Sequence, residues 1–170
     1  MKRSLSLGLF SLALLAGCLQ ITIVKQSEHI PISQMTFSTN YVQQGEVTSV
    51  PGQIEVENKA GEIEVHGADV TAVSWSWELQ VRATDEGAAQ EAIHAATCRT
   101  GTEQNTLRVA VSFPESGKKY TCRSNLKLTV PKSVSVKTHT SYGETRIATL
   151  NGNVEARDQS GSVKIRSIHG

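Results

Sequence analysis

The sequence has few aromatic residues, few prolines and almost no excess of either charge. Aromatic side chains make up 5% of the 170 residues, there are four prolines, and 17 Lys and Arg stand against 16 Asp and Glu. A net charge of +1 excludes a protein that binds nucleic acid electrostatically, because such a protein needs a basic patch to neutralise phosphates. With 38% hydrophobic residues, the chain is also neither disordered nor of low complexity, and its length suits one domain.

Motifs of the common enzyme classes are missing as well. The sequence has no GxSxG nucleophile turn, no P-loop, no HExxH zinc motif and no GxGxxG loop. Glu62 and Glu64 share one face of a predicted strand and could imitate the carboxylate pair of a glycosidase, but two neighbouring carboxylates on a strand are usually a solvated face. We therefore predict no catalytic residue, no cofactor and no metal site.

The first 17 residues have the pattern of an export signal. Lys2 and Arg3 supply a positive start, and an apolar run from Leu5 to Leu15 follows. The segment closes on Leu15-Ala-Gly-Cys18, which resembles the lipobox of bacterial lipoproteins. The resemblance implies cleavage before Cys18 and attachment of a diacylglycerol to its thiol.

Cys18 is therefore the predicted lipidation site, through which the protein meets a membrane. Two or three acyl chains, palmitate among them, would hold it there durably, because each buried CH₂ contributes about 0.8 kcal/mol. Leu19 follows the cysteine in place of Asp, which by resemblance to enterobacterial sorting indicates the outer membrane if the host has one. The alternatives are a transmembrane anchor, for which the apolar stretch is short, and an ordinary secretory signal followed by a chance cysteine.

The other two cysteines, Cys98 and Cys122, are predicted to form a disulfide. An exported protein meets an oxidising compartment, and the lipid uses the third cysteine. Closing the segment between them would stabilise the fold by roughly 3.5 kcal/mol in the chain-entropy model. The alternatives are two buried free thiols and metal ligation, and the absence of a CxxC or HxxxH spacing disfavours the second.

Residues 18–50 are polar and lack sustained periodicity. They predict a lipid anchor followed by a polar tether, with a candidate strand near Met35–Val42. From residue 51 onward the pattern changes to a single β-rich domain that extends to residue 170.

Glycines at a nine-residue spacing organise much of this domain. They are Gly52, Gly61, Gly143, Gly152, Gly161 and Gly170. Two and four residues behind a glycine lie aliphatic side chains, such as Ile54 and Val56, and the residues between them are polar. This alternation predicts short strands with one buried face, with a glycine at each corner between strands. Stacked units would bury their apolar pairs together, so we expect a mainly β, solenoid-like stack with rungs over residues 132–170; an antiparallel meander is the alternative.

Between the two glycine blocks, residues 71–130 predict a β-α-β-β insert. The first strand alternates from Val73 to Val81, and Thr84 is the predicted N-cap of a helix that Gly101 terminates. Two more strands follow, from Leu107 to Phe113 and from Tyr120 to Val130.

Trp75 and Trp77 occupy the apolar positions of the first strand of this insert. Alternation directs both rings inward, which favours core packing. A shift of one residue in register would instead bring both rings to the surface together, where they would form a ligand platform.

The run Ile54-Glu-Val-Glu-Asn-Lys-Ala-Gly-Glu-Ile-Glu-Val-His-Gly67, the insert, Leu128-Thr-Val-Pro131 and the glycine rungs together resemble one bacterial family. It is a family of unknown function whose members are often described as putative adhesins, and the resemblance covers about 120 residues. It implies a right-handed parallel β-solenoid on exported or envelope proteins and transfers no enzymatic residue.

These observations predict a non-enzymatic envelope lipoprotein whose β-solenoid serves as a structural or interaction module. The edge of the last rung, near Val163–Ile168, would expose unpaired main-chain groups and could add a strand from a second copy or from another protein. Binding of a cell-surface polysaccharide or other ligand is the first alternative. A carbohydrate-active enzyme is the second, and the scarcity of acidic groups disfavours it.

Overall fold

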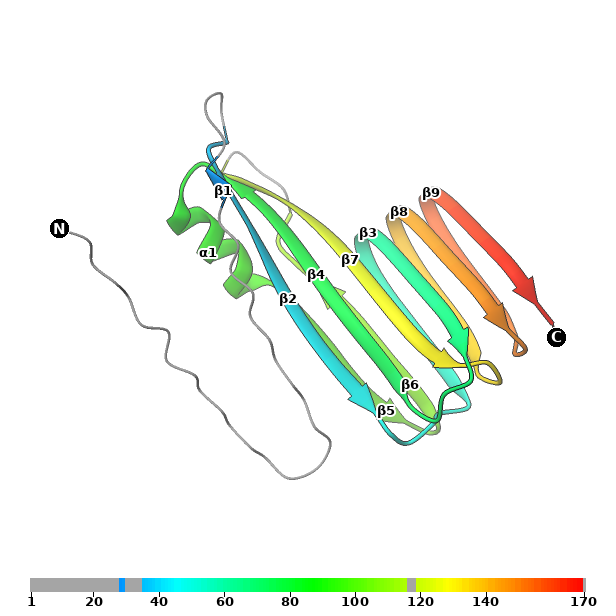
Figure 1. Cartoon of the computed structure of the whole chain (residues 1–170). Coiled ribbons are helices and arrows are strands. Elements are labelled where there is room, and N and C mark those ends of the chain that lie inside the picture. The colour runs from blue at the N-terminus through cyan, green and yellow to red at the C-terminus, as the bar shows by residue number, and fades with distance from the viewer. Residues whose placement is uncertain (1–27, 30–34, 116–118, 170) are drawn as a thin grey trace.

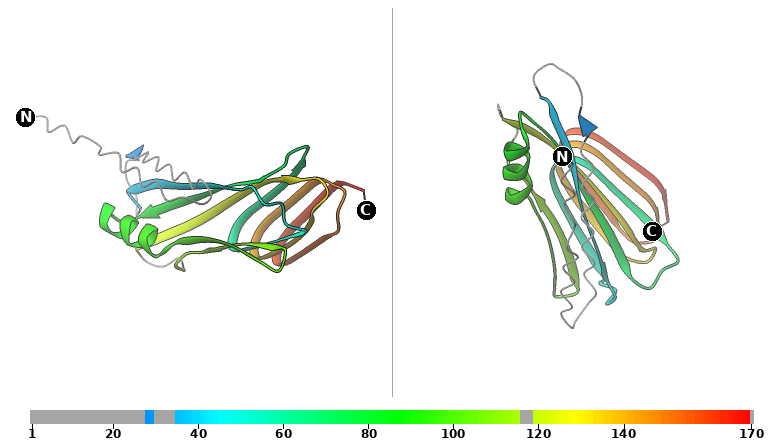
Figure 2. Two further views of the ribbon diagram at one scale, coloured as in Figure 1. Left: turned by 90° about the horizontal axis from the view of Figure 1, so that it is seen from below. Right: turned by 60° about the vertical axis from the view of Figure 1, so that its left-hand side comes forward.

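The computed structural model describes residues 28–29, 35–115 and 119–169, which form one nine-stranded sheet and one helix. The fold is mainly β, as the sequence predicts. The sheet is open and curled, so that its two halves face each other across the core (Figures 1 and 2). The predicted export signal and Cys18 lie outside the described residues.

One half of the sheet, called here the upper half, contains an antiparallel group. Its strands are β1 (Glu28–His29), β2 (Phe37–Val47), β4 (Val73–Ala83) and β7 (Tyr120–Pro131), which are neighbours in that order. β7 then pairs in parallel with the second part of β3 (Gln53–Ala68). The candidate strand near Met35–Val42 is thus confirmed as part of β2, and the strand continues to Val47 within the segment assigned to the tether, because β2 pairs with β4 along its whole length.

The other half, the lower half, begins with the hairpin of β5 (Thr97–Glu103) and β6 (Thr106–Ser112). Gln104 and Asn105 connect them with φ of 45° and 66°, as a two-residue turn between antiparallel strands requires. β6 then runs parallel to the first part of β3. The predicted β-α-β-β insert therefore has one strand more, since β5 occupies residues that were predicted to form the helix and its C-terminal end.

Three long bent strands join the two halves: β3, β8 (Ser135–Leu150) and β9 (Val154–Ile168). They are parallel and in register, with Ile54 beside Val136 and Val136 beside Val154. Parallel pairing excludes the antiparallel meander for this part of the chain. Two nine-residue units make one bent strand, so units that lie side by side in β8 and β9 are 18 residues apart.

The bend of each strand falls at a column of glycines, where Gly61 lies beside Gly143 and Gly143 beside Gly161. Gly61 and Gly143 have φ of 126° and 142°, a conformation that side chains rarely adopt. A Cβ on Gly143 would also lie 1.7 Å from the carbonyl oxygen of Gly61. The predicted corner role of glycine is confirmed at these two positions.

Helix α1 (Glu86–Ala95) connects the halves at the end of the molecule away from β9, where it packs against β2, β4 and β7 (Figure 1). Its buried face consists of Ala88, Ala89 and Ala92, small side chains that allow close approach. The N-cap is Asp85, whose carboxylate accepts a hydrogen bond from the Ala88 amide at 2.8 Å. The prediction of Thr84 as N-cap was wrong, because its hydroxyl instead donates to Asp85.

The helix is also shorter than predicted. It ends at Ala95, and Gly101 lies inside β5. The Ala96 amide hydrogen-bonds the Ile93 carbonyl while Ala96 itself adopts an extended conformation, so the chain enters the next strand without a glycine. The prediction that Gly101 terminates the helix was therefore wrong.

Candidate interaction surface at the open edge of strand β9

The two tryptophans proposed as a ligand platform lie in the core. Trp75 is 4% exposed and Trp77 is fully buried. The Trp77 indole N–H donates to the Ser124 hydroxyl at 2.9 Å, and its ring meets Tyr41 edge-on with centroids 5.7 Å apart. The platform prediction is thereby corrected, because the register of β4 sends both rings inward and neither face is free to stack on a ligand.

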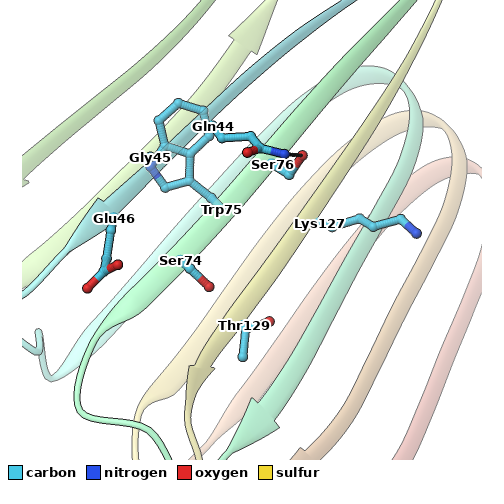
Figure 3. Close-up of a pocket in the computed structure, with 8 residues that line it drawn as sticks. All are labelled: Gln44, Gly45, Glu46, Ser74, Trp75, Ser76, Lys127 and Thr129. Atoms are coloured by element: carbon cyan, nitrogen blue, oxygen red, sulfur yellow. Dashed lines mark hydrogen bonds between the residues drawn. The ribbon is translucent and has the colours of Figure 1, made fainter. Parts of the chain in front are cut away.

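Trp75 lies beside a depression of about 420 Å³ on strands β2, β4 and β7. Figure 3 shows its ring extending across Gly45, where a Cβ would come within 2.5 Å of the indole. The other lining side chains are polar: Gln44, Glu46, Ser74, Ser76, Lys127 and Thr129. The Gln44 amide reaches the Ser76 hydroxyl at 3.4 Å. The ring therefore fills space beneath the strand, and the depression presents no aromatic face.

Cys98 and Cys122 are not joined to each other in the structure. Cys98 lies on β5 and Cys122 on β7, and β3 and β6 separate these strands in the sheet. Burial raises the pKa of Cys98 to about 12 and also raises that of Cys122. The disulfide therefore finds no support here, and the alternative of partly buried thiols describes their surroundings.

A network of ion pairs crosses the outer face of the bent strands. Glu62 pairs with Arg123 and with Arg146, and Glu144 pairs with Arg146 and with Lys164, both at 2.5 Å. Hydrogen bonds from Lys164 and Arg146 hold the pKa of Glu144 below its ordinary value. A further ion pair joins Glu64 to Lys127 at 3.4 Å. The Glu62 and Glu64 pair considered for glycoside chemistry is thus bound into a ladder of opposite charges across the strands.

The edge of β9 is the most distinctive surface of the described residues. β9 pairs with β8 on one side and with no other described strand. Two of its inward-facing side chains, Val163 and Ile165, are 39% and 46% exposed. The residues beside them on β8, Thr145 and Ile147, are buried because β9 covers them. An open main-chain edge and an uncovered apolar strip thus coincide.

The β5 edge, which ends the lower half of the sheet, has a different character. Its inward-facing residues Thr100 and Thr102 lie opposite Val109 and Leu107 of β6, and both threonines are exposed. Hydroxyl side chains at such positions remain hydrated, so this edge has little to gain by pairing with another strand. The β5 and β9 edges therefore differ in the property that drives association, which is the burial of apolar surface.

A notch of about 370 Å³ lies at the bend of the strands, beside the glycine column. Tyr142 lines it and is 59% exposed, more than any other Phe, Trp or Tyr among the described residues. Glu62, Arg123 and Glu144 line the same notch. Sequence analysis did not single out Tyr142, because its exposure depends on the bend, and the only local signal was the glycine that follows it.

The described part of the chain holds no cluster of three or more His, Cys, Asp or Glu side chains able to bind a metal ion. Within the same residues, no helix has the length and apolar character needed to cross a bilayer. Neither finding bears on Cys18, which lies outside those residues.

No family model matches this chain, and no curated protein matches it. Among solved structures, it is similar to a putative cell adhesion protein from Clostridium sporogenes, with a TM-score of 0.48, 11% identity and coverage of 74% of this chain and 60% of that one. It is also similar to a putative adhesin from Bacteroides fragilis, with a TM-score of 0.38, 11% identity and coverage of 74% and 55%.

A third similar structure is a putative lipid binding protein from Parabacteroides distasonis, with a TM-score of 0.33, 14% identity and coverage of 75% and 58%. The chain thus spans between 55% and 60% of the length of these three proteins. Two of the three are described as a putative cell adhesion protein and a putative adhesin.

Proposed function

We propose that this chain is a non-enzymatic module of the bacterial envelope that binds a partner by accepting a β-strand at the open edge of β9. The observation that carries the proposal is the exposure of Val163 and Ile165, whose counterparts on β8 are buried. An apolar strip beside unpaired N–H and C=O groups is a template for pairing. An added strand would satisfy both, with main-chain hydrogen bonds for affinity and side-chain contacts for specificity.

The bent strand is the unit that makes such addition possible. β3, β8 and β9 repeat the same path through both halves of the sheet, and each covers the apolar residues of the one before. We therefore regard the three as turns of a short β-solenoid, in which each turn buries its neighbour's inner face. A partner strand on β9 would act as the next turn.

The lipid predicted at Cys18 gives the module its location. Acyl chains would fix the N-terminal side of the chain at a membrane, and residues between Cys18 and β2 would separate the sheet from the lipid. The proposal for the whole protein is an envelope lipoprotein, in the outer membrane where one exists, that presents the β9 edge to partners.

Site-specific photo-crosslinking tests the binding function. The full-length chain, expressed in its own host, would carry benzoylphenylalanine in place of Ile165 or, as the matched control, in place of Thr102 on the β5 edge. We expect irradiation of cells to give a polypeptide adduct from position 165 and none from position 102. Equal labelling at both positions, or no adduct at 165, would contradict the proposal.

Binding of a polysaccharide is a second candidate, and Tyr142 is the observation that favours it. An exposed ring beside carboxylate and guanidinium groups offers both an apolar face and hydrogen bonds, a combination that suits a sugar. The test is a glycan array probed with the full-length protein and its Tyr142→Ala and Tyr142→Phe variants. A ligand retained by Tyr142→Phe and lost with Tyr142→Ala supports this function, and a ligand indifferent to both excludes Tyr142 from the site.

A further inference from the structure

We propose that the partner at the β9 edge is a second copy of this chain, related by a two-fold axis that runs along the strands between the upper and lower halves of the sheet. The inference rests on the proposed function and specifies its partner. It follows from the way in which β9 passes through both halves.

The two parts of β9 run in opposite directions because the chain turns back at the bend (Figure 1). Residues 154–158 lie beside residues 136–140 of β8 in the lower half, and residues 161–168 lie beside residues 143–150 in the upper half. A two-fold rotation along the strands exchanges the halves. It therefore places residues 154–158 of one copy beside residues 161–168 of the second copy, antiparallel to them, and repeats the same contact on the other side of the axis.

Side chains match in this arrangement. The inward residues of the first part of β9 are Val154 and Ala156, and those of the second part are Val163 and Ile165. Pairing Val154 with Ile165 of the second copy also pairs Ala156 with Val163 of the second copy, so apolar residues meet on the inner face. The core of each copy would then continue into the other without a break.

The outer face has complementary charges in the same register. Glu155 falls opposite Lys164 of the second copy, and both side chains are about half exposed, at 48% and 54%. Within one chain, Glu155 pairs with Arg157 and Lys164 pairs with Glu144, so the new contact would extend the existing ladder of ion pairs across the axis. Opposite charges directly across an antiparallel pair favour that register.

The geometry favours a second copy over an unrelated strand. Both halves of the sheet end together at β9, so a partner that covers the whole edge must supply two strands of opposite direction at the separation of the two halves. A second β9 has that bend and that separation by construction, whereas a straight added strand would cover one half and leave the other open. An isologous contact is also closed, so association stops at the dimer.

Disulfide trapping tests the arrangement. The register above places Ser160 near the axis, opposite Gln159 of the second copy and diagonal to Ser160 of the second copy, and Ser160 is exposed. The full-length Ser160→Cys variant in membranes, mildly oxidised, should give an adduct of twice the chain mass. Thr102→Cys on the β5 edge is the matched control, and the wild-type chain sets the background from native cysteines.

A charged side chain introduced on the inner face of the β9 edge provides a second test of the arrangement. Ile165→Lys should lower the yield of the Ser160→Cys adduct at least about tenfold, because it places an ammonium group in the shared core. Thr102→Lys in the same background should leave the yield unchanged. Since Ile165 is 46% exposed in the single chain, the thermal midpoint of Ile165→Lys should stay close to that of the wild type when both are dilute and monomeric, which shows that the variant folds.

The outcomes separate the dimer from the wider function. No adduct of twice the chain mass from Ser160→Cys, an equal yield from Thr102→Cys, or a yield indifferent to Ile165→Lys would overturn the two-fold arrangement. If position 165 still crosslinks to a different polypeptide, the dimer fails while strand addition stands. If position 165 crosslinks to nothing, both fail.

Discussion

The two ends of this curled sheet differ in the side chains that their edge strands expose. At the helix end, α1 packs its alanine face against β2, β4 and β7, and the β5 edge carries Thr100 and Thr102 where apolar residues would otherwise face inward. At the other end, β9 keeps Val163 and Ile165 exposed in the corresponding inward positions. Of these two edges, β9 alone combines unpaired backbone with exposed apolar side chains, so the asymmetry favours the β9 end as the one that binds a partner.

The largest expected effect on stability comes from the column of glycines at the bend of β3, β8 and β9. Gly143→Ala should destabilise the protein by more than about 3 kcal/mol, because the new Cβ meets the Gly61 carbonyl and the residue has φ of 142°. Gly101→Ala on the β5 edge is the control, since a Cβ there meets nothing within 4 Å. Its cost should stay within about 0.5 kcal/mol. Chemical denaturation measures the free energy of unfolding of both variants. Losses of similar size would contradict the conformation assigned to Gly143 at the bend.

A matched pair of isoleucines compares the covered strand with the open one. Ile147 and Ile165 lie side by side on β8 and β9, and they are 1% and 46% exposed. Ile147→Ala should cost about 2–5 kcal/mol through lost burial and a cavity, whereas Ile165→Ala should cost less than about 1 kcal/mol under conditions where the chain is monomeric. Equal losses in dilute protein would mean that β9 is already covered.

At the helix end, the N-cap gives a smaller effect with a distinct pH dependence. The hydrogen bond from the Ala88 amide, with that from Thr84, lowers the pKa of Asp85 below its ordinary 3.8. Its contribution is therefore present above the pKa of the unfolded chain and is lost as the pH falls through the lower pKa of the folded one. Asp85→Ala should lower the melting temperature by a few degrees at neutral pH.

Asp85→Asn serves as the control for that effect, because asparagine caps without titrating. Its melting temperature should approach that of the wild type near neutral pH and should not show the loss in acid attributable to this residue. A loss in acid of the same size in the wild type and in Asp85→Asn would assign the pH dependence to other groups.

The smallest effect concerns the thiol of Cys98 near the helix end. Burial raises its pKa to about 12, so the reactive thiolate is rare at neutral pH. The folded protein should therefore alkylate at Cys98 much more slowly than the unfolded chain, as peptide mass spectrometry can measure. Alkylation at equal rates would place the thiol in solvent, and a Cys98–Cys122 peptide found without reduction would restore the disulfide.

Sequence patterns predicted the parts of this fold in which the local signal and the tertiary role coincide. The glycine spacing located the bends at Gly61 and Gly143, and the alternation from Val73 to Val81 located β4 with its buried tryptophans. The edge near Val163–Ile168 was likewise expected from the repeat. In each case one face of a strand carries the information, because burial is decided residue by residue with a period of two.

Other features depend on contacts that no local pattern encodes. β5 was missed because two of its three inward positions, Thr100 and Thr102, are threonines, and a polar edge strand has no apolar alternation to reveal it. β2 was only partly expected, since its polar sequence becomes a strand through pairing with β4. The repeat was predicted to be nine residues long, whereas residues that pair between β8 and β9 are 18 apart. The glycine spacing alone does not distinguish a bend within a strand from a turn between strands.

The most direct test of the asymmetry is residue-resolved amide hydrogen exchange of the full-length protein in lipid vesicles at low and high surface density. We expect the amides on the outer edge of β9 to exchange quickly at low density and to become protected at high density, while those of β5 exchange at the same rate throughout. Equal behaviour of the two edges, or protection that appears on β5 alone, would contradict the assignment of β9 as the binding end.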